Sequence, residues 1–287
     1  MPCTLANREE TLKSLDWLPK LSPMLTQLLA RFAHKNCDAN ALAEVVERDA
    51  MLAAQVLRLA NSATFGRRQP IHTIKHAIAL IGVGAMRRFA IGSSLFNLFS
   101  RSKTAPGFSV IRFNLHSVAT GTLVEMLATD LPVQDAENAF VSGLLHDVGK
   151  MLIAVSLHKE YNQILEFAAV TNLPLIECER QILGTDHAEL SGLAIARWQL
   201  PEPVQRAGFD HHDPECTKMV PGAKKLSLTS VVGKADAFVN FLGMSVLPPT
   251  GLAVEAPTLE FAGFPYNQER TLARFQSAWT RLDEFFR

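Results

Sequence analysis

Apolar residues recur along most of this chain at intervals of three and four positions, which is the spacing of one face of an α-helix. Few segments alternate with the period of two that marks a half-buried β-strand. In the first hundred residues, Ser22 followed by Pro23 is a predicted helix start. The spacing there predicts helices over 22–32, 39–48, 49–60, 73–82 and 84–99.

The second part of the chain shows the same spacing after a segment, 100–108, that has the turn residues and charge of a linker. Asp135 is the predicted cap of one helix, and Asp186 with Glu189 is the predicted capping pair of another. The predicted helices run over 111–126, 135–146, 186–198, 203–211, 226–242 and 267–286, with an irregular connector over 246–265.

These patterns predict an all-α protein with two parts. The first is an N-terminal helical subdomain over 1–106, and the second is a helical subdomain with a C-terminal helical extension over 107–287. The composition agrees, because 48% of the 287 residues are apolar and 20% are charged, which excludes a disordered chain.

Charge, targeting signals and cysteines indicate the cellular compartment in which we expect the protein. Basic and acidic side chains balance at 28 each, but residues 1–106 carry 14 basic and 7 acidic groups, so the two parts have opposite net charge. The N-terminus lacks the apolar core of a secretion signal, and the longest uncharged apolar stretch, near 77–86, is half the length of a bilayer span. The four cysteines form no CxxC pair. We expect a cytoplasmic protein with reduced thiols and no membrane contact.

The basic excess in residues 1–106 raises the question of nucleic-acid binding. Two arginine pairs, at 67–68 and 87–88, each lie near a phenylalanine. A nucleic-acid surface would need such charges on one face with aromatic residues between them. Arginine beside phenylalanine is also common in ordinary cores, so we expect solvated faces or docking against the acidic second part instead. A steep salt dependence of binding would indicate nucleic acid.

Several polar side chains fall on apolar helix faces in the second part. Asp147 continues the face of Leu144, Asp236 lies between apolar residues of its helix, and His211 follows Ala207 on one face. Burying an unpaired charge costs many kcal/mol, so these groups need partners, and a shared metal ion is one answer. Each could also be a hydrogen-bonded core residue, a helix cap or half of an ion pair.

The His-Asp pair in LLHDVGK, at 144–150, resembles the motif that names the HD superfamily of metal-dependent phosphohydrolases. The resemblance implies that a helical histidine, the pair itself and a later aspartate hold a metal ion. It also implies a second ion, held as in the HD-GYP branch, with Asp147 bridging. The implied ligands are His116, His146, Asp147 and Asp236 for the first ion, and His187, His211 and His212 with Asp147 for the second.

Four segments in order, at 49–66, 71–88, 144–150 and 184–203, resemble the HDOD family, the HD-related output domain of bacterial signalling proteins. The resemblance implies an N-terminal helical bundle with an HD-like helical domain. Many members lack part of the metal set and act by binding, whereas all seven positions here hold residues able to bind metal. No GYP element follows the paired histidines, which argues against hydrolysis of cyclic dinucleotides.

Mixed imidazole and carboxylate ligands suit one or two ions of Fe, Mn, Co or Zn, and such ions can clamp a phosphate. Lys150 lies three residues after Asp147 and could contact a phosphate oxygen, or it could complete a helix C-terminus. We therefore expect a signalling output module that binds a partner protein or a small phosphate-containing ligand. The alternative is an active metal-dependent phosphohydrolase on a nucleotide or phosphoester.

Overall fold

Helices make up the regular structure of the computed structural model, which describes residues 5–32, 37–62, 69–100, 102–213, 223–246 and 257–286. Within these ranges no β-strand forms, and one isolated parallel bridge joins Val133 to Leu226. The predicted all-α class is confirmed.

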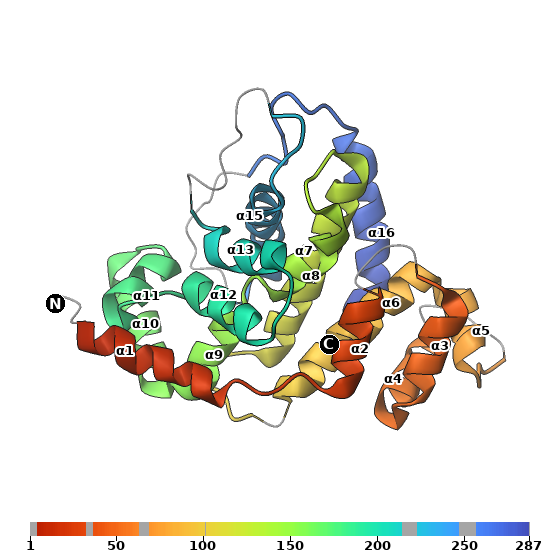
Figure 1. Cartoon of the computed structure of the whole chain (residues 1–287), viewed down its shortest axis with the longest axis horizontal. Coiled ribbons are helices and arrows are strands. Elements are labelled where there is room, and N and C mark those ends of the chain that lie inside the picture. Colours follow the sequence, from red (N-terminus) through yellow and green to blue (C-terminus); the bar gives the residue numbers. More distant parts are fainter. Residues whose placement is uncertain are drawn as a thin grey trace. The chain divides into compact units, whose positions relative to one another are not determined.

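Each predicted helix has a counterpart in the predicted order, and the structure adds helices over 5–12, 148–156, 158–171 and 175–183 that were not predicted. Figure 1 labels most of the elements. The α-helices are α1 Leu5–Leu12, α2 Pro23–Phe32, α3 Ala39–Glu47, α4 Ala50–Ala60, α5 Ile74–Ile81, α6 Val83–Phe99, α7 Val110–Asp130, α8 Ala139–Leu145, α9 Val148–Ser156, α10 His158–Thr171, α11 Leu175–Leu183, α12 His187–Arg197, α13 Glu202–Asp210, α15 Leu228–Val239 and α16 Gln268–Phe286. Two 3₁₀ segments, η1 Lys13–Trp17 and η3 Ala136–Asn138, and one π-helical segment, η4 Asn240–Met244, complete the set in the described residues.

Contacts divide the chain into two units. One consists of Met1–Lys20 and Arg101–Asn267, and the other of Leu21–Ser100 and Gln268–Arg287. The change near residue 100 lies close to the predicted boundary between 1–106 and 107–287, but the two ends of the chain are assigned differently. The first twenty residues join the larger unit because η1 packs on α9 and α12, and α16 joins the smaller unit because it packs on α6.

The smaller unit contains α2 to α6 and α16, with apolar residues on the inner face of each helix from α2 to α6. The predicted cap at its start is confirmed, because the Ser22 hydroxyl accepts a hydrogen bond from the amide of Leu25 at 3.1 Å. Arg87 is buried and its Nη1 donates to the carbonyl of Phe32 at 3.1 Å. This arginine therefore stabilises the interior of the unit and contributes no surface charge. The other arginine pair, 67–68, lies outside the described residues.

The larger unit is organised around α7, which runs beside α8 and also contacts α15 (Figure 1). The backbones of α7 and α8 approach closely because glycines face each other: a Cβ on Gly143 would lie 2.7 Å from the Cα of Gly121. A Cβ on Gly149 of α9 would lie 2.1 Å from the carbonyl oxygen of His187 in α12. Only glycine permits these contacts, which bring the middle of α7 against the end of α8 and the start of α9 against the start of α12.

One predicted helix start is wrong. Asp135 has φ 54°, a left-handed conformation, and its side chain caps nothing; η3 follows it, and α8 begins only at Ala139. The physical reason is a tertiary pairing, since Gln134 N–H donates to the carbonyl of Leu226 at 2.9 Å and the chain must then turn sharply. By contrast, Asp186 caps α12 as predicted, accepting from the amide of Glu189 at 2.9 Å.

By length and composition, one described segment, Ala136–Ser156, is apolar enough to cross a membrane. In the structure 83% of its most apolar window is buried inside the protein. The helices α5 and α6 are long and apolar enough to cross a membrane only if they are taken as one segment, and the chain bends by 115° between them. The core of the fold thus accounts for the apolar composition of the segment 136–156.

Candidate metal centre

The seven side chains singled out as metal ligands come together in the larger unit, from five separate places in the chain. Six of them are buried and the seventh, His212, is partly buried. The contributing residues are His116 in the middle of α7, His146 and Asp147 in the turn between α8 and α9, His187 at the start of α12, His211 and His212 at the end of α13, and Asp236 in α15.

The first group consists of His116, His146, Asp147 and Asp236, whose ligand atoms all lie within 4.8 Å of one another. His116 Nε2 lies 3.2 Å from Asp147 Oδ2 and 3.1 Å from Asp236 Oδ1. His146 Nε2 lies 3.5 Å and 3.3 Å from the same two oxygens. Two imidazole nitrogens therefore face two carboxylate oxygens in a buried space.

The second group consists of Asp147, His187, His211 and His212, whose ligand atoms also lie within 4.8 Å of one another. Asp147 Oδ1 lies 3.3 Å from His187 Nε2 and 3.6 Å from His211 Nε2. His212 Nε2 lies 3.1 Å from His187 Nε2. Asp147 belongs to both groups, with Oδ2 toward the first and Oδ1 toward the second, which is the geometry of a carboxylate that bridges two ions.

Backbone carbonyls orient three of these imidazoles. Nδ1 of His116 lies 3.1 Å from the carbonyl oxygen of Met244, Nδ1 of His146 lies 2.8 Å from that of Gly143, and Nδ1 of His211 lies 3.0 Å from that of Gly208. A carbonyl oxygen only accepts hydrogen bonds, so Nδ1 carries the proton in each case. In the neutral form of each ring, Nε2 directs its lone pair at the centre, as in metal-binding histidines.

Glu179 orients His187 in the same way and was missed by the sequence analysis. Its Oε2 accepts hydrogen bonds from Nδ1 of His187 at 2.5 Å and from the amide of that residue at 2.9 Å. Burial raises the pKa of Glu179 to about 8, so a nearby positive charge would be needed to keep it ionised at neutral pH. The signal available was its place on the face of α11 that holds Leu183, four residues later.

The π-helical segment η4 holds two further parts of the centre. Nδ2 of Asn240 donates to Oδ1 of Asp236 at 2.8 Å, and the carbonyl of Met244 accepts from His116. Gly243 has φ 80° and kinks the segment between them. Sequence periodicity predicted an ordinary helix over 226–242, and it contains no signal for the extra residue per turn that a π segment introduces.

The carboxylates of the centre are ionised, and three of its imidazoles are neutral because burial lowers their pKa, that of His146 included. Burial alone would raise the pKa of Asp147, but His146 and Lys150 hold it well below its usual range. Burial lowers the pKa of His187 well below 6.5 and that of His212 to about 2. Anionic carboxylate and neutral imidazole are the forms that bind metal ions.

His116 differs from these imidazoles, because in the absence of a metal it is held in its protonated form. Burial on its own would lower its pKa, but hydrogen bonds to Asp147 and Asp236 together raise it to about 9. A positive charge is therefore favoured between the two carboxylates. A bound metal ion would supply that charge in place of the proton.

Two buried atoms of the second group have no hydrogen-bond partner, Asp147 Oδ1 and His211 Nε2. Both are acceptors, and an unsatisfied buried polar atom costs about 1–3 kcal/mol. A cation at the point where they converge would satisfy both. The donor set therefore fits a divalent metal ion, and the role of the seven residues as its ligands remains a prediction.

Lys150 lies beside the shared carboxylate. Its Nζ donates to Asp147 Oδ2 at 2.6 Å, and its side chain is 14% exposed. The residue is in the first turn of α9, so the interpretation of Lys150 as the end of a helix is wrong. Asp147 makes no capping hydrogen bond at the start of α9 either, so its carboxylate is directed entirely at the centre.

Comparisons with known proteins match this architecture. The chain superposes on the crystal structure of an HDOD domain protein of unknown function from Geobacter sulfurreducens with a TM-score of 0.73. The two sequences are 22% identical, and the match covers 98% of this chain and 96% of that one. A protein from Shewanella amazonensis, provisionally named a phosphohydrolase, gives 0.65 with 21% identity over 96% of this chain and 98% of its own. One from Marinobacter aquaeolei, provisionally named a signal transduction protein, gives 0.70 with 18% identity over 98% of this chain and 64% of its own.

The chain also spans 43% of the length of a curated relative, an uncharacterised protein from Treponema pallidum that is 22% identical over 241 residues, or 79% of this chain. The family model described as the HDOD domain matches residues 18–214, which is more than half of the chain. On this match, the chain belongs to the HDOD family.

Proposed function

We propose that this chain is a signalling output module that binds one or two divalent transition-metal ions and, through them, a phosphate-containing small ligand. The observation that carries the proposal is the position of Asp147, whose two oxygens face two different groups of imidazoles. A carboxylate so placed suits two ions side by side. The chemistry of the donors, imidazole nitrogen with carboxylate oxygen, favours Fe, Mn, Co or Zn.

Different residues hold the ions and contact the phosphate in the proposed site. When bound, such ions clamp phosphate oxygens and lower the pKa of a coordinated water. Lys150 adds a point charge beside the shared carboxylate, where it can donate to a phosphate oxygen. His116, His146, Asp147 and Asp236 would hold one ion, and Asp147, His187, His211 and His212 the other.

Membership of the HDOD family supports a binding role in signalling, because HDOD domains are output modules of bacterial signalling proteins. The similar Marinobacter aquaeolei protein carries a signal-transduction name, which agrees with that role. No GYP element follows His212 in the sequence, which argues against hydrolysis of cyclic dinucleotides. A partner protein that reads the state of the module is part of the proposal.

Hydrolysis of a phosphoester is the second candidate. The full set of seven ligand side chains, with Lys150 beside them, favours it, because catalytic metal sites need both an activated water and charge at the phosphate. The similar Shewanella amazonensis protein carries a phosphohydrolase name. Turnover of a general phosphodiester that disappears in both His146→Ala and Asp147→Ala would establish this candidate over pure binding.

Binding of inorganic phosphate to metal-loaded and chelator-treated protein tests the proposal. We expect binding to the loaded protein that is lost after the metal is removed and regained when Mn²⁺ or Zn²⁺ is restored. Equal binding before and after metal removal would contradict a phosphate site at the ions. The exposed His158, replaced by Ala, is the control for histidine loss outside the centre.

A further inference from the structure

The N-terminal segment 8–19 packs on three helices of the larger unit that carry residues of the metal centre. Its helix α1 packs on α11, and η1 packs on α9 and α12 (Figure 1). Thr11 and Leu15, in the middle of the segment, are buried. The segment is therefore part of the folded unit, and it contacts the helices of Lys150, Glu179 and His187.

Three contacts join α1 to the turn between α11 and α12. The hydroxyl of Thr11 donates to the carbonyl of Leu183 at 3.1 Å, where α11 ends. Gly184 follows with φ 72°, and a Cβ on it would lie 3.0 Å from the Cβ of Arg8. The guanidinium of Arg8 pairs with Glu189 in the first turn of α12. The contacts thus lie on both sides of the candidate ligand that begins α12.

Two further contacts join the rest of the segment to the other end of α12. Nη1 of Arg197 donates to the carbonyl of Leu15 at 2.7 Å. Nε1 of Trp198 donates to the carbonyl of Pro19 at 2.9 Å. Because both acceptors belong to the backbone, these contacts require the segment to follow one path. The helix α12 is therefore held by the segment at both ends.

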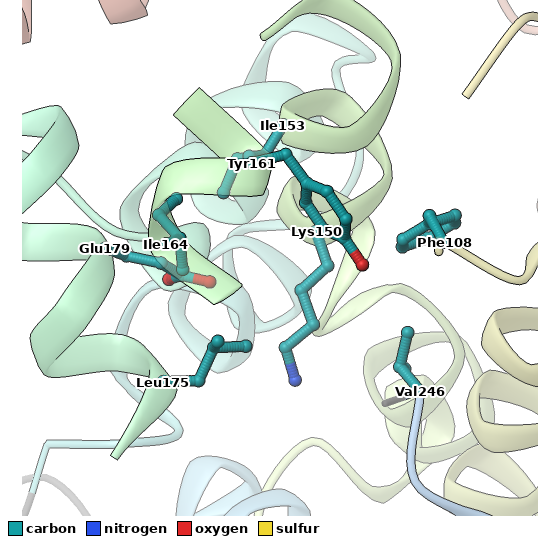
Figure 2. Close-up of a pocket in the computed structure, with 8 residues that line it drawn as sticks. All are labelled: Phe108, Lys150, Ile153, Tyr161, Ile164, Leu175, Glu179 and Val246. Carbon is teal, nitrogen blue, oxygen red and sulfur yellow. The ribbon is translucent and has the colours of Figure 1, made fainter. Parts of the chain in front are cut away.

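On its inner side, the turn between α11 and α12 is packed tightly against the centre. Glu179 accepts from Nδ1 of His187, and a Cβ on Gly149 would lie 2.1 Å from the carbonyl oxygen of His187. Figure 2 shows Glu179 and Lys150 on the walls of a narrow cavity between α9, α10 and α11. Its free space of about 10 Å³ has room for about one water molecule. With so little free space, a shift of the turn would move the imidazole of His187.

We propose that the segment 8–19 is a clamp that positions His187, and that its docking and the binding of the second ion favour each other. The proposal rests on the proposed function, because it concerns the ion of the second group. An ion that fixes His187 also fixes the turn that Arg8 and Thr11 contact, and a docked segment holds this turn where the ion binds. By linkage, each event favours the other by the same factor. The chain enters the smaller unit at Leu21, so a change in docking reaches that unit through the chain itself.

Substitutions in the segment test one direction of this coupling. Arg8→Ala removes the ion pair with α12, and Thr11→Val removes the hydroxyl while keeping the volume. In a protein that carries both changes, we expect the affinity for the second ion to fall by about fivefold or more, with the affinity for the first ion unchanged. Metal titration with a competing chelator measures both affinities. Arg58→Ala is the control, because Arg58 is exposed and belongs to the smaller unit.

Amide hydrogen exchange tests the other direction and needs no substitution in the segment. We expect the amides of 8–19 to exchange about fivefold more slowly in metal-loaded wild-type protein than in chelator-treated protein. His212→Ala removes a ligand of the second group only and should cancel this protection. Asp236→Ala removes a ligand of the first group only and should keep it. A general loss of stability would not distinguish these two variants in this way.

The outcomes separate the two proposals. If the wild-type protein binds metal but the segment exchanges equally fast with and without it, the clamp proposal is wrong and the metal centre stands. Protection that persists in His212→Ala, or unchanged affinity for the second ion in the doubly substituted protein, would overturn it as well. If that protein does not fold, the exchange measurements decide alone. If the wild-type protein binds no metal, the proposed function itself fails, and the clamp proposal fails with it.

Discussion

At the scale of single residues, the centre is built from histidines whose Nδ1 is already occupied. His116, His146 and His211 each use a carbonyl oxygen for this purpose, and His187 uses the carboxylate of Glu179. The imidazole rings are therefore held in place before any ion arrives, which reduces the entropy lost on binding. In the second group the orienting partner of His187 is a side chain, Glu179, and a conservative substitution can therefore weaken it.

Replacing Glu179 with Gln tests this dependence. The amide keeps the volume but cannot carry the negative charge that Glu179 takes on behind His187 when a metal ion is bound, so affinity for the ion of the second group should fall by about 10- to 100-fold. The first group should be unaffected. Metal titration with a competing chelator measures both sites, and Glu177→Gln, on the same helix with a side chain that is 47% exposed, is the control. Unchanged affinity at both sites in Glu179→Gln would contradict the assigned role.

The seven candidate ligands could be recognised from sequence because each is either part of a motif or a polar residue on an apolar helix face. Glu179 and Asn240 belong to no motif, and the hydrogen bonds that they make to His187 and Asp236 depend on where the fold places α11 and the π segment η4. The carbonyl of Met244 carries no side-chain signal at all. Orientation of ligands is thus a property of the fold, whereas ligand identity is visible in the sequence.

At the scale of elements, close helix packing sets the distances in the centre. Gly121 and Gly143 let α7 and α8 approach, and this approach fixes His116 relative to His146. Helix starts such as Ser22 and Asp186 were predictable because a cap is a local signal. The start of α8 and the π segment η4 were not predictable, because a pairing with Leu226 determines the first and a kink at Gly243 lies within the second.

Gly143→Ala tests the role of this packing. The new Cβ would lie 2.7 Å from the Cα and 2.9 Å from the N of Gly121, and backbone atoms cannot move aside without shifting a helix. We expect a loss of about 1–3 kcal/mol in the free energy of unfolding, together with weaker metal binding. Chemical denaturation measures the first quantity. Gly84→Ala in α6 is the control, because its Cβ would meet only Arg88 at 3.6 Å; if both variants were equally stable, the close approach would not matter.

At the scale of the whole molecule, the centre joins segments from five places in the larger unit. A metal ion that binds them only when folded stabilises that unit, by about 2.7 kcal/mol when its free concentration is a hundred times its Kd. The smaller unit contributes none of the candidate ligands. Metal occupancy should therefore change the stability of the larger unit in particular.

The pH dependence of stability should reverse when the metal is removed. In the metal-free protein the pKa of His116 is raised from 6.5 to about 9, so its contribution is complete below pH 6.5 and is lost as the pH rises to 9. The raised pKa of Glu179, about 8, acts in the same direction. Metal-loaded protein should instead gain stability over this range, because protons compete less with the metal. Thermal unfolding at pH 6.5 and 9, with and without chelator, measures this; parallel profiles would contradict it.

The most direct test is the metal content of protein purified without chelator, compared between wild type, His146→Ala and His158→Ala. His146 lies in the centre, and His158 is an exposed histidine of the same unit. The account predicts one or two equivalents of a transition metal per chain in the wild type and in His158→Ala, and a clear loss in His146→Ala. Less than about 0.1 equivalent in the wild type, or equal metal in all three proteins, would contradict it.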